Sequence, residues 1–149
     1  MRRAALDTRT GQGIEPRMAN DHPNVERVRA GFEAFARGDL SGLDELLDDD
    51  VVWHQPGKNS IAGTYRGKAD LLSLFVRIWQ ETEGSVETRI LDVFADDEFA
   101  VVLIHAKAER GELRQDNHVV HVLKLTPEAK LKERWALADD QADIDRFWA

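Results

Sequence analysis

The hydrophobic period of the chain changes near residue 85, and this change constrains the fold more than any other feature. Before it, apolar residues recur at steps of three and four, as they do on the buried side of amphipathic helices. Val25, Val28, Phe32 and Phe35 form one such stripe. After it, apolar and polar residues alternate, which is typical of β-strands whose two faces meet different surroundings. Helices that precede strands, without a repeating βαβ order, predict the α+β class.

Capping residues mark the helix boundaries in the first half of the chain. Asp21 can cap a helix whose first turn tolerates Pro23, because an N–H at that position would have no partner anyway. Gly38 fits the left-handed position just beyond the end of that helix. The other elements predicted in this half are a short helix over residues 40–47 that the acidic run 48–50 closes, a strand over 51–54, a loop over 55–63 and a third helix over 68–81.

Four long strands are predicted after the change of period, over residues 86–95, 99–110, 114–126 and 131–139. The turns between them are short, and short connections imply an antiparallel meander. Strands of this length twist and coil, so three helices packed on one face leave a cone-shaped cavity. A final short helix is predicted around Ile144. The expected fold is therefore a curved antiparallel sheet wrapped on three helices, a cone-shaped barrel with a central pocket.

The charge and the residue composition exclude several classes of protein. The 149-residue chain has 28 acidic and 20 basic side chains, a formal net charge of -8, and no cysteine. Without cysteine there is no disulfide framework, thiolate nucleophile or cysteine-ligated zinc, and an acidic chain lacks the basic face that nucleic acids require. No apolar run reaches the roughly 20 residues of a membrane helix, and no signal-peptide block follows the first arginines. We therefore expect a cytoplasmic protein with no nucleic-acid or membrane partner.

The first twenty residues differ from the rest of the chain. They contain four arginines and two acids, are interrupted by Gly11, Gly13 and Pro16, and have no apolar period. Such a segment buries too little apolar surface to offset its ordering entropy. Residues 1–20 are therefore predicted to form a mobile tail and residues 21–149 the folded domain. One hypothesis makes Met18 the natural start of the protein, and a genuine tail is the alternative.

The order of the predicted elements and several short stretches resemble the nuclear transport factor 2-like superfamily. Particular stretches look like its SnoaL-like branch of polyketide cyclase-like and ketosteroid isomerase-related domains. The matching stretches are FEAF to GDL within residues 32–40, DDVVWHQPG at 49–57, AGTYRG at 62–67, HVLKL at 121–125 and ERW at 133–135. The resemblance covers the chain from residue 23 onward. It implies the cone fold, but relatives include isomerases, cyclases, dehydratases, epoxide hydrolases and binding modules, so it does not fix the activity.

The resemblance also implies a homodimer, because relatives pack the outer faces of their sheets together. Four apolar side chains would otherwise leave that outer face exposed in this chain, namely Val102, Ile104, Val120 and Val122.

Two positions depart from the catalytic relatives. The position of the aspartate base of ketosteroid isomerase looks like Gln55, which cannot accept and carry a proton. The position of the acid/base aspartate of SnoaL-type cyclases falls near Ala136, and Asp139 is a possible substitute. The sequence therefore leaves open whether the chain is an enzyme. A non-catalytic ligand-binding or dimerising interaction module is the alternative.

Strand alternation sorts the candidate pocket residues. If Leu125 pairs with Leu131, one face of the last two long strands carries Asn117, Val119, His121 and Leu123 opposite Asp139, Leu137, Trp135 and Glu133. This register places His121 beside Trp135 and Asn117 beside Asp139, on the face expected to line the cone.

His121 and Asp139 are the expected acid/base residues, because an imidazole exchanges protons near neutral pH and both would lie among apolar neighbours. Tyr65 or Asn117 would polarise a substrate carbonyl. The competing interpretation makes His121 a core histidine bonded to Glu133 or to the backbone, and Tyr65 a loop residue packed on the third helix. A hydrolase that activates water between Asp139 and His121 is a third hypothesis.

Seven further residues are expected to contact the ligand: Trp53, His54, Phe75, His105, Asn117, Val119 and Trp135. His118 and His121 lie three residues apart on a strand and point to opposite faces, so they cannot chelate one metal. A three-histidine zinc site that includes His105 is the remaining metal alternative, but neither a metal nor a cofactor is expected, because no EF-hand, phosphate-loop or dinucleotide signature is present. The predicted partner is a small apolar molecule, acted on by cofactor-independent proton transfer in an isomerase, cyclase or lyase step.

Overall fold

The computed structural model describes residues 5–6, 13–14 and 18–149 of the chain. Residues 1–4, 7–12 and 15–17 belong to the predicted tail and lie outside the described part. Within that tail, β1 (Ala5–Leu6) pairs with β2 (Gly13–Ile14). Ala19 already belongs to the folded body, since its backbone N–H donates to the Ala95 carbonyl at 2.9 Å and its own carbonyl accepts from Ala95 at 2.8 Å.

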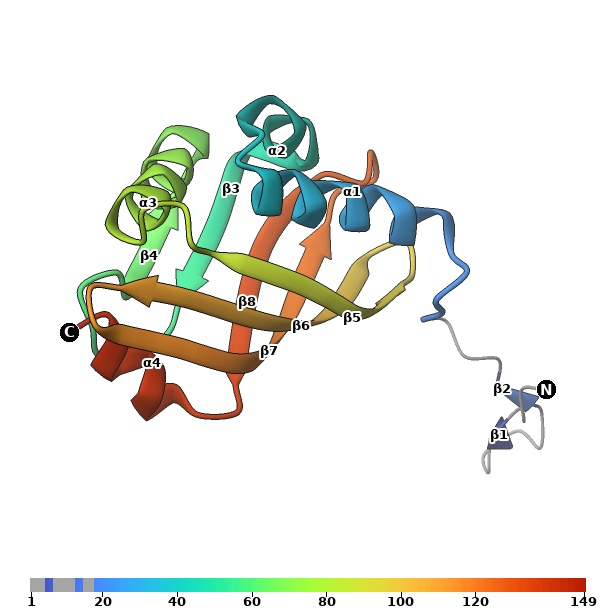
Figure 1. Ribbon diagram of the computed structural model, residues 1–149. Coiled ribbons are helices and arrows are strands. Elements are labelled where there is room, and N and C mark those ends of the chain that lie inside the picture. Colours follow the sequence, from blue (N-terminus) through green and yellow to red (C-terminus); the bar gives the residue numbers. More distant parts are fainter. Residues whose placement is uncertain (1–4, 7–12, 15–17) are drawn as a thin grey trace.

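Three helices cover one face of a sheet, and a fourth packs against β7 (Figure 1). They are α1 (Pro23–Arg37), α2 (Leu40–Leu46), α3 (Lys68–Glu81) and α4 (Gln141–Phe147). The cap of α1 is His22 and not Asp21, because the imidazole Nδ1 accepts a hydrogen bond from the Asn24 N–H at 3.0 Å. Gly38 ends the helix with a φ of 69°, as its position predicts. No helix in the described part of the chain is long and apolar enough to cross a membrane.

The sheet has six strands in the order β4-β3-β8-β7-β6-β5. Their bounds are β3 (Leu47–Gln55), β4 (Gly63–Arg66), β5 (Glu87–Ala95), β6 (Phe99–Arg110), β7 (Leu113–Leu125) and β8 (Leu131–Ala138). Strands β5 to β8 form the predicted antiparallel meander, which confirms the α+β class.

Three expectations about the first strands are wrong. The acidic residues 48–50 do not close α2 but extend β3, since Leu47 and Val51 on either side of them are buried. The end of the predicted loop continues into β4, which pairs with β3. Strand β3 runs parallel to β8, so the sheet is mixed and curved rather than purely antiparallel, and it is open between its edges instead of closing into a barrel.

A β-bulge decides which residues of β8 face the helices. Leu125 pairs with Leu131 as expected, but Lys124 pairs with Glu133, so one extra residue of β8 is inserted between the two pairs. Beyond the bulge, His121 pairs with Ala136 and Val122 pairs with Trp135. Because the side chains of a strand alternate, this shift of one residue moves the whole predicted set of β8 residues to the opposite face.

We call the side of the sheet covered by α1 to α3 the inner face and the opposite side the outer face. The inner face and the helices share the core, in which Val28, Leu71, Phe75 and Leu123 are buried almost completely. Val102 and Ile104 were expected on the outer face but are buried on the inner one, since Val102 pairs with His121. Each fully buried side chain of this size contributes about 1.5–3 kcal/mol of hydrophobic stabilisation.

Candidate functional site

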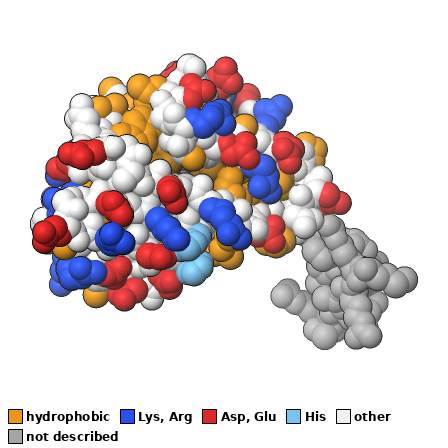
Figure 2. Space-filling view, in the orientation of Figure 1, with side chains coloured by type: hydrophobic (Ala, Val, Ile, Leu, Met, Phe, Trp, Pro, Cys, Tyr) orange, Lys and Arg blue, Asp and Glu red, His pale blue; other side chains and the backbone are white. Residues whose placement is uncertain are grey.

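Two adjoining hollows lie between the helices and the inner face. They contain about 680 and 720 Å³ of empty space, their open mouths included. Figure 2 shows hydrophobic side chains gathered between the helical layer and the strands. Seven residues line both hollows: Phe35, Gln55, Ile78, Thr88, Ile104, His121 and Arg134. The first hollow, which Phe32, Trp53 and Phe75 also line, is the more apolar and aromatic of the two.

Arg134 and His121 form the polar centre of the site. Arg134, on β8, is 3% exposed, and its Nε donates to His121 Nδ1 at 2.9 Å. Its Nη1 donates to the His54 carbonyl at 2.7 Å and to Gln55 Oε1 at 3.2 Å. All three acceptors are electrically neutral groups when the histidine is neutral.

Aromatic rings hold this centre in place. The guanidinium carbon of Arg134 lies 4.0 Å from the ring centroid of Trp53, a cation–π arrangement. Gln55 Oε1 also accepts from Trp53 Nε1 at 3.0 Å, so one amide oxygen orients both the cation and the indole. Phe32 packs edge-on against His121, with a centroid distance of 4.9 Å. The side chains are therefore packed from several sides.

The contacts also fix the protonation of His121. Burial, and secondarily the charge of Arg134, lower the pKa of His121 well below its usual 6.5, so the imidazole is neutral at pH 7. Nδ1 accepts the hydrogen bond from Arg134, and the proton of the neutral ring therefore resides on Nε2. Nε2 is buried and has no partner among the described residues. Burial also lowers the pKa of Arg134 to about 9. This value is still above neutral pH, so the guanidinium remains charged at pH 7.

Four of the predicted site residues line the hollows. Trp53 and Phe75 line the first hollow, Val119 lines the second, and His121 lines both. They come from β3, α3 and β7, elements that are distant in sequence and meet across the core.

Asp139 does not lie beside His121. The bulge places it at the outer face, where its carboxylate contacts His118 Nδ1 at 3.1 Å and half of its side chain is exposed. A hydrogen bond from the His118 backbone, followed by the contacts with the side chains of His118 and Asn117, lowers the pKa of Asp139. A solvated carboxylate with a lowered pKa is a weak base, so the expected acid/base pair is not formed. Asn117 is buried and donates to Asp139 at 3.4 Å, but it lines neither hollow.

Trp135, His54 and His105 were expected to contact the ligand but lie on the outer face. Trp135 is 39% exposed and stacks on His54, with a ring-centroid distance of 5.7 Å. His54 Nε2 contacts the Glu133 carboxylate at 2.6 Å. His105 is paired with Asp116 and stacks on His118. No three His, Asp or Glu side chains of the described residues lie close enough to hold a metal ion.

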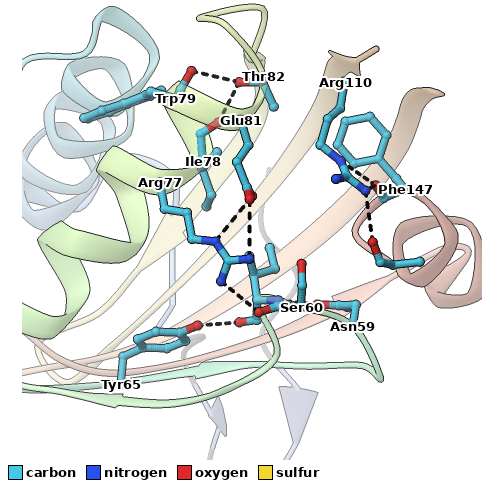
Figure 3. Close-up of polar contacts among 12 residues, drawn as sticks. Asn59, Ser60, Tyr65, Arg77, Ile78, Trp79, Glu81, Thr82, Arg110 and Phe147 are labelled. Carbon is cyan, nitrogen blue, oxygen red and sulfur yellow. Dashed lines mark hydrogen bonds and ion pairs between the residues drawn. The ribbon is translucent and has the colours of Figure 1, made fainter. Parts of the chain in front are cut away.

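Tyr65 lines neither hollow. Its hydroxyl donates to the Ile61 carbonyl at 2.7 Å, as Figure 3 shows for the loop beside Ser60. Arg77 binds the Ser60 carbonyl of the same loop at 2.9 Å. The tyrosine thus orders the loop between β3 and β4, and its hydroxyl is not available to polarise a ligand carbonyl.

Two residues of the polar centre were not among the sequence candidates for the site. The bulge-free register places Arg134 on the outer face, where an arginine is ordinary. The resemblance to ketosteroid isomerase marks Gln55 only as the residue at the position of a catalytic aspartate. The two residues together are the signal that could have found the site. Arg134 is a cation on β8, and the neighbouring strand β3 has Gln55 where the catalytic relatives have an aspartate.

Comparisons with known proteins agree with this fold. The model of the SnoaL-like domain matches residues 28–134. An uncharacterized protein of Mycobacterium tuberculosis is 28% identical over 135 residues, which are 87% of this chain and 98% of the relative. The structure of Bal32a, from a soil-derived mobile gene cassette, superposes with a TM-score of 0.81 at 32% identity and covers 85% of this chain and 96% of its own.

The fold is also similar to that of IdmH from Streptomyces antibioticus, a protein assigned as a polyketide cyclase. The TM-score is 0.66 at 18% identity, over 79% of this chain and 93% of IdmH. An identity this low supports likeness of fold only. The family model, in contrast, matches well over half of the residues. The chain therefore belongs to the SnoaL-like domain family.

Proposed function

We propose that the protein binds a small, largely apolar carbonyl compound in the first hollow and holds its oxygen with His121. The observation that carries this proposal is the Nε2–H group of His121, a residue that lines the hollow: the group is buried and has no acceptor among the described residues. A buried donor left without a partner costs about 1–3 kcal/mol, and a ligand oxygen would remove that cost. The apolar walls would contact the rest of the ligand.

The same contacts would polarise the ligand. Donors aimed at a carbonyl oxygen stabilise the negative charge that develops there when a neighbouring C–H group loses its proton. This is the electrophilic half of a cofactor-independent isomerase, cyclase or lyase step.

The basic half has no candidate on these walls. No Asp or Glu side chain of the described residues lines either hollow, and the proton on Nε2 leaves His121 no lone pair toward the ligand. Ligand binding with polarisation of the oxygen, which would promote loss of the neighbouring proton to a base outside these walls such as water, is therefore the proposed function. The lack of a base favours a non-catalytic binding module as the second candidate.

A neutral aromatic ketone, 2-acetylnaphthalene, tests the binding function. We expect saturable quenching of tryptophan fluorescence, with an affinity at least about tenfold weaker in the His121→Asn variant. Asparagine keeps an acceptor for Arg134 but is too short to replace the Nε2–H group. His118→Asn, on the outer face, is the matched control and should bind the ketone as the wild type does. Absence of saturable binding, or equal affinities in the wild type and His121→Asn, would overturn the proposal.

Proton exchange separates the two candidates. If the site promotes enolisation, the methyl protons of bound 2-acetylnaphthalene exchange with deuterium faster than in buffer, which NMR detects. Saturable binding without faster exchange identifies a non-catalytic module.

We further propose that a second copy of the chain covers the outer face. An apolar row crosses four neighbouring strands there and consists of Phe94, Val101, Val122 and Trp135. Phe94 and Trp135 are each 39% exposed, and nearby Leu137 is 73% exposed. Three histidine–carboxylate pairs lie on the same face. The surface therefore offers apolar area together with hydrogen-bond donors and acceptors, so that it can be complementary to an identical copy, as a twofold interface requires.

A further inference from the structure

Arg134 is a buried cation without a buried anion. None of the ion pairs among residues 18–149 includes it, although eleven other pairs of oppositely charged or histidine–carboxylate groups occur there. Its hydrogen bonds go to an imidazole nitrogen, a backbone carbonyl and a side-chain amide. A charge removed from water without a counter-charge is costly, and buried charges in proteins are ordinarily paired.

The unpaired charge of Arg134 borders the two hollows as well as the packed core. Arg134 lines both hollows. Its bonds use Nε and Nη1, and no hydrogen bond from Nη2 occurs among the described residues. The Nε2–H of His121, the imidazole that Arg134 contacts, is likewise without an acceptor in that part of the chain. Two neighbouring residues thus have donor capacity left, and one of them carries a full positive charge.

The remaining walls reinforce this asymmetry of charge. The only other charged side chain that lines either hollow in the described part is Lys107, at the second hollow, and it is also a cation. A ligand that supplied a negative oxygen would therefore meet attraction from every charged group on the walls, whereas a cationic ligand would meet only repulsion.

We propose that the natural ligand is an organic anion, with an apolar and preferably aromatic body and a carboxylate, phenolate or enolate oxygen bound by Arg134 and His121. This inference rests on the proposed function, since it places the ligand oxygen at the same imidazole, and adds the sign of the ligand's charge. An anionic oxygen makes stronger hydrogen bonds to a guanidinium than a neutral carbonyl does.

Three naphthalene probes of similar size test the sign of the charge. They are 2-naphthoate, the neutral 2-acetylnaphthalene and the cationic 2-naphthylmethylammonium, each titrated at pH 7.5 by calorimetry and tryptophan fluorescence. We expect 2-naphthoate to bind at least about tenfold more tightly than the ketone and the ammonium compound to bind most weakly. Equal affinities for naphthoate and ketone would overturn the anion proposal and leave the carbonyl-binding function intact. If neither probe binds, both proposals fail.

Two variants trace the preference to Arg134. Arg134→Gln removes the charge, and we expect the naphthoate affinity to fall at least about tenfold while the ketone affinity changes less. Arg114→Gln is the control, because it removes the same charge from an exposed position on β7 and should leave both affinities unchanged. This comparison separates a local contact from the general effect of net charge.

Gln55→Glu keeps the test decisive if Arg134→Gln does not fold. Glutamate is nearly isosteric with glutamine and retains acceptors for Arg134 and Trp53, but it supplies the missing counter-charge. We expect the preference for naphthoate over ketone, taken as the ratio of the two affinities within this variant, to shrink below about threefold, whatever the change in the ketone affinity itself. If Gln55→Glu preserves the full preference, the charge of Arg134 is not its source and the proposal is wrong.

Discussion

His118 and His121 are three residues apart on β7, yet the two faces of the sheet give them opposite surroundings. On the outer face, half of the His118 side chain is exposed and it contacts the Asp139 carboxylate. On the inner face, His121 is 6% exposed and its neighbour is the cation Arg134. The three histidines described on the outer face, His54, His105 and His118, each have a carboxylate partner, whereas His121 on the inner face has none among the described residues.

The difference shows where an unsatisfied group is tolerated. Outer-face histidines have both water and acids available, so their pairing says little about function. No described Asp or Glu lines the hollows of the inner face, and the unpaired donor of His121 and the unpaired charge of Arg134 belong to neighbouring residues that line them. The contrast between the faces, more than the presence of histidine itself, identifies the candidate site.

The largest expected effect is on the free energy of unfolding, when an apolar side chain is shortened on one face of the sheet or the other. Leu123→Ala on the inner face should lower the free energy of unfolding by about 2–5 kcal/mol, because a side chain that is 0% exposed leaves a cavity. Leu137→Ala, at 73% exposure on the outer face, should change it by less than about 0.5 kcal/mol in the dissociated monomer. Urea unfolding at low protein concentration measures both. Equal losses would contradict the distinction between the faces.

Assembly probes the outer face alone. Leu137→Asp places a charge beside the apolar row of the outer face and should weaken the proposed dimer about 100-fold. Sedimentation equilibrium measures this loss as a shift toward monomer. Affinity for 2-acetylnaphthalene should be unchanged, because Leu137 lines neither hollow. A wild-type chain that is monomeric at all concentrations would exclude the homodimer.

The pH dependence of stability probes the inner face. Because the pKa of His121 is lowered by folding, the unfolded chain binds the proton more readily than the folded one. Stability should therefore fall as pH drops below about 6.5, by up to about 1.4 kcal/mol per pH unit from this group. The difference between the wild type and His121→Asn isolates this contribution from those of the carboxylates. Curves that stay parallel between pH 6.5 and 5 would show that His121 is not held neutral by the fold.

The smallest expected effect concerns an ion pair of the outer face. Glu133→Gln removes the carboxylate partner of His54 and should change the free energy of unfolding by no more than about 1 kcal/mol, since partly exposed pairs contribute little. Chemical denaturation at 0.1 and 1 M salt measures it. A loss of several kcal/mol would mean that the outer pairs are structural and not merely solvated.

Much of the fold could be predicted from periodicity, because helices and strands with one buried side carry their own pattern. The four long strands and α3 lie within two residues of their expected bounds. The parallel pairing of β3 with β8 could not be predicted in this way, since it joins segments about 80 residues apart and leaves no local signature. The bulge in β8 could not be predicted from the sequence either, because the turn that precedes it is compatible with both registers.

The site was predicted less well than the fold, for a reason visible in β8. Trp135 and Leu137 are larger and more apolar than Arg134 and Ala136, so the usual rule assigns them to the interior. In the structure the small and charged residues face the helices and the large apolar ones face outward. This rule fails where both faces of a sheet carry apolar side chains. An apolar outer face is also what the proposed dimer would require, because a second copy of the chain would cover it.

The bulge in β8 has one more consequence. A single residue, Lys132, separates the observed register from the regular one, in which Trp135 and Leu137 would enter the hollow and Arg134 would leave it. If Lys132 instead paired with Lys124, the bulge would vanish and a charged binding site would become a hydrophobic plug, whereas deletion of Lys132 would remove the bulge and keep Arg134 opposite Leu123 on the inner face. The extra residue alone therefore does not set the pocket chemistry: the pairing of Glu133 with Lys124 does, and a slip of one residue in that pairing is a short evolutionary route by which one SnoaL-like scaffold could gain or lose its charged centre.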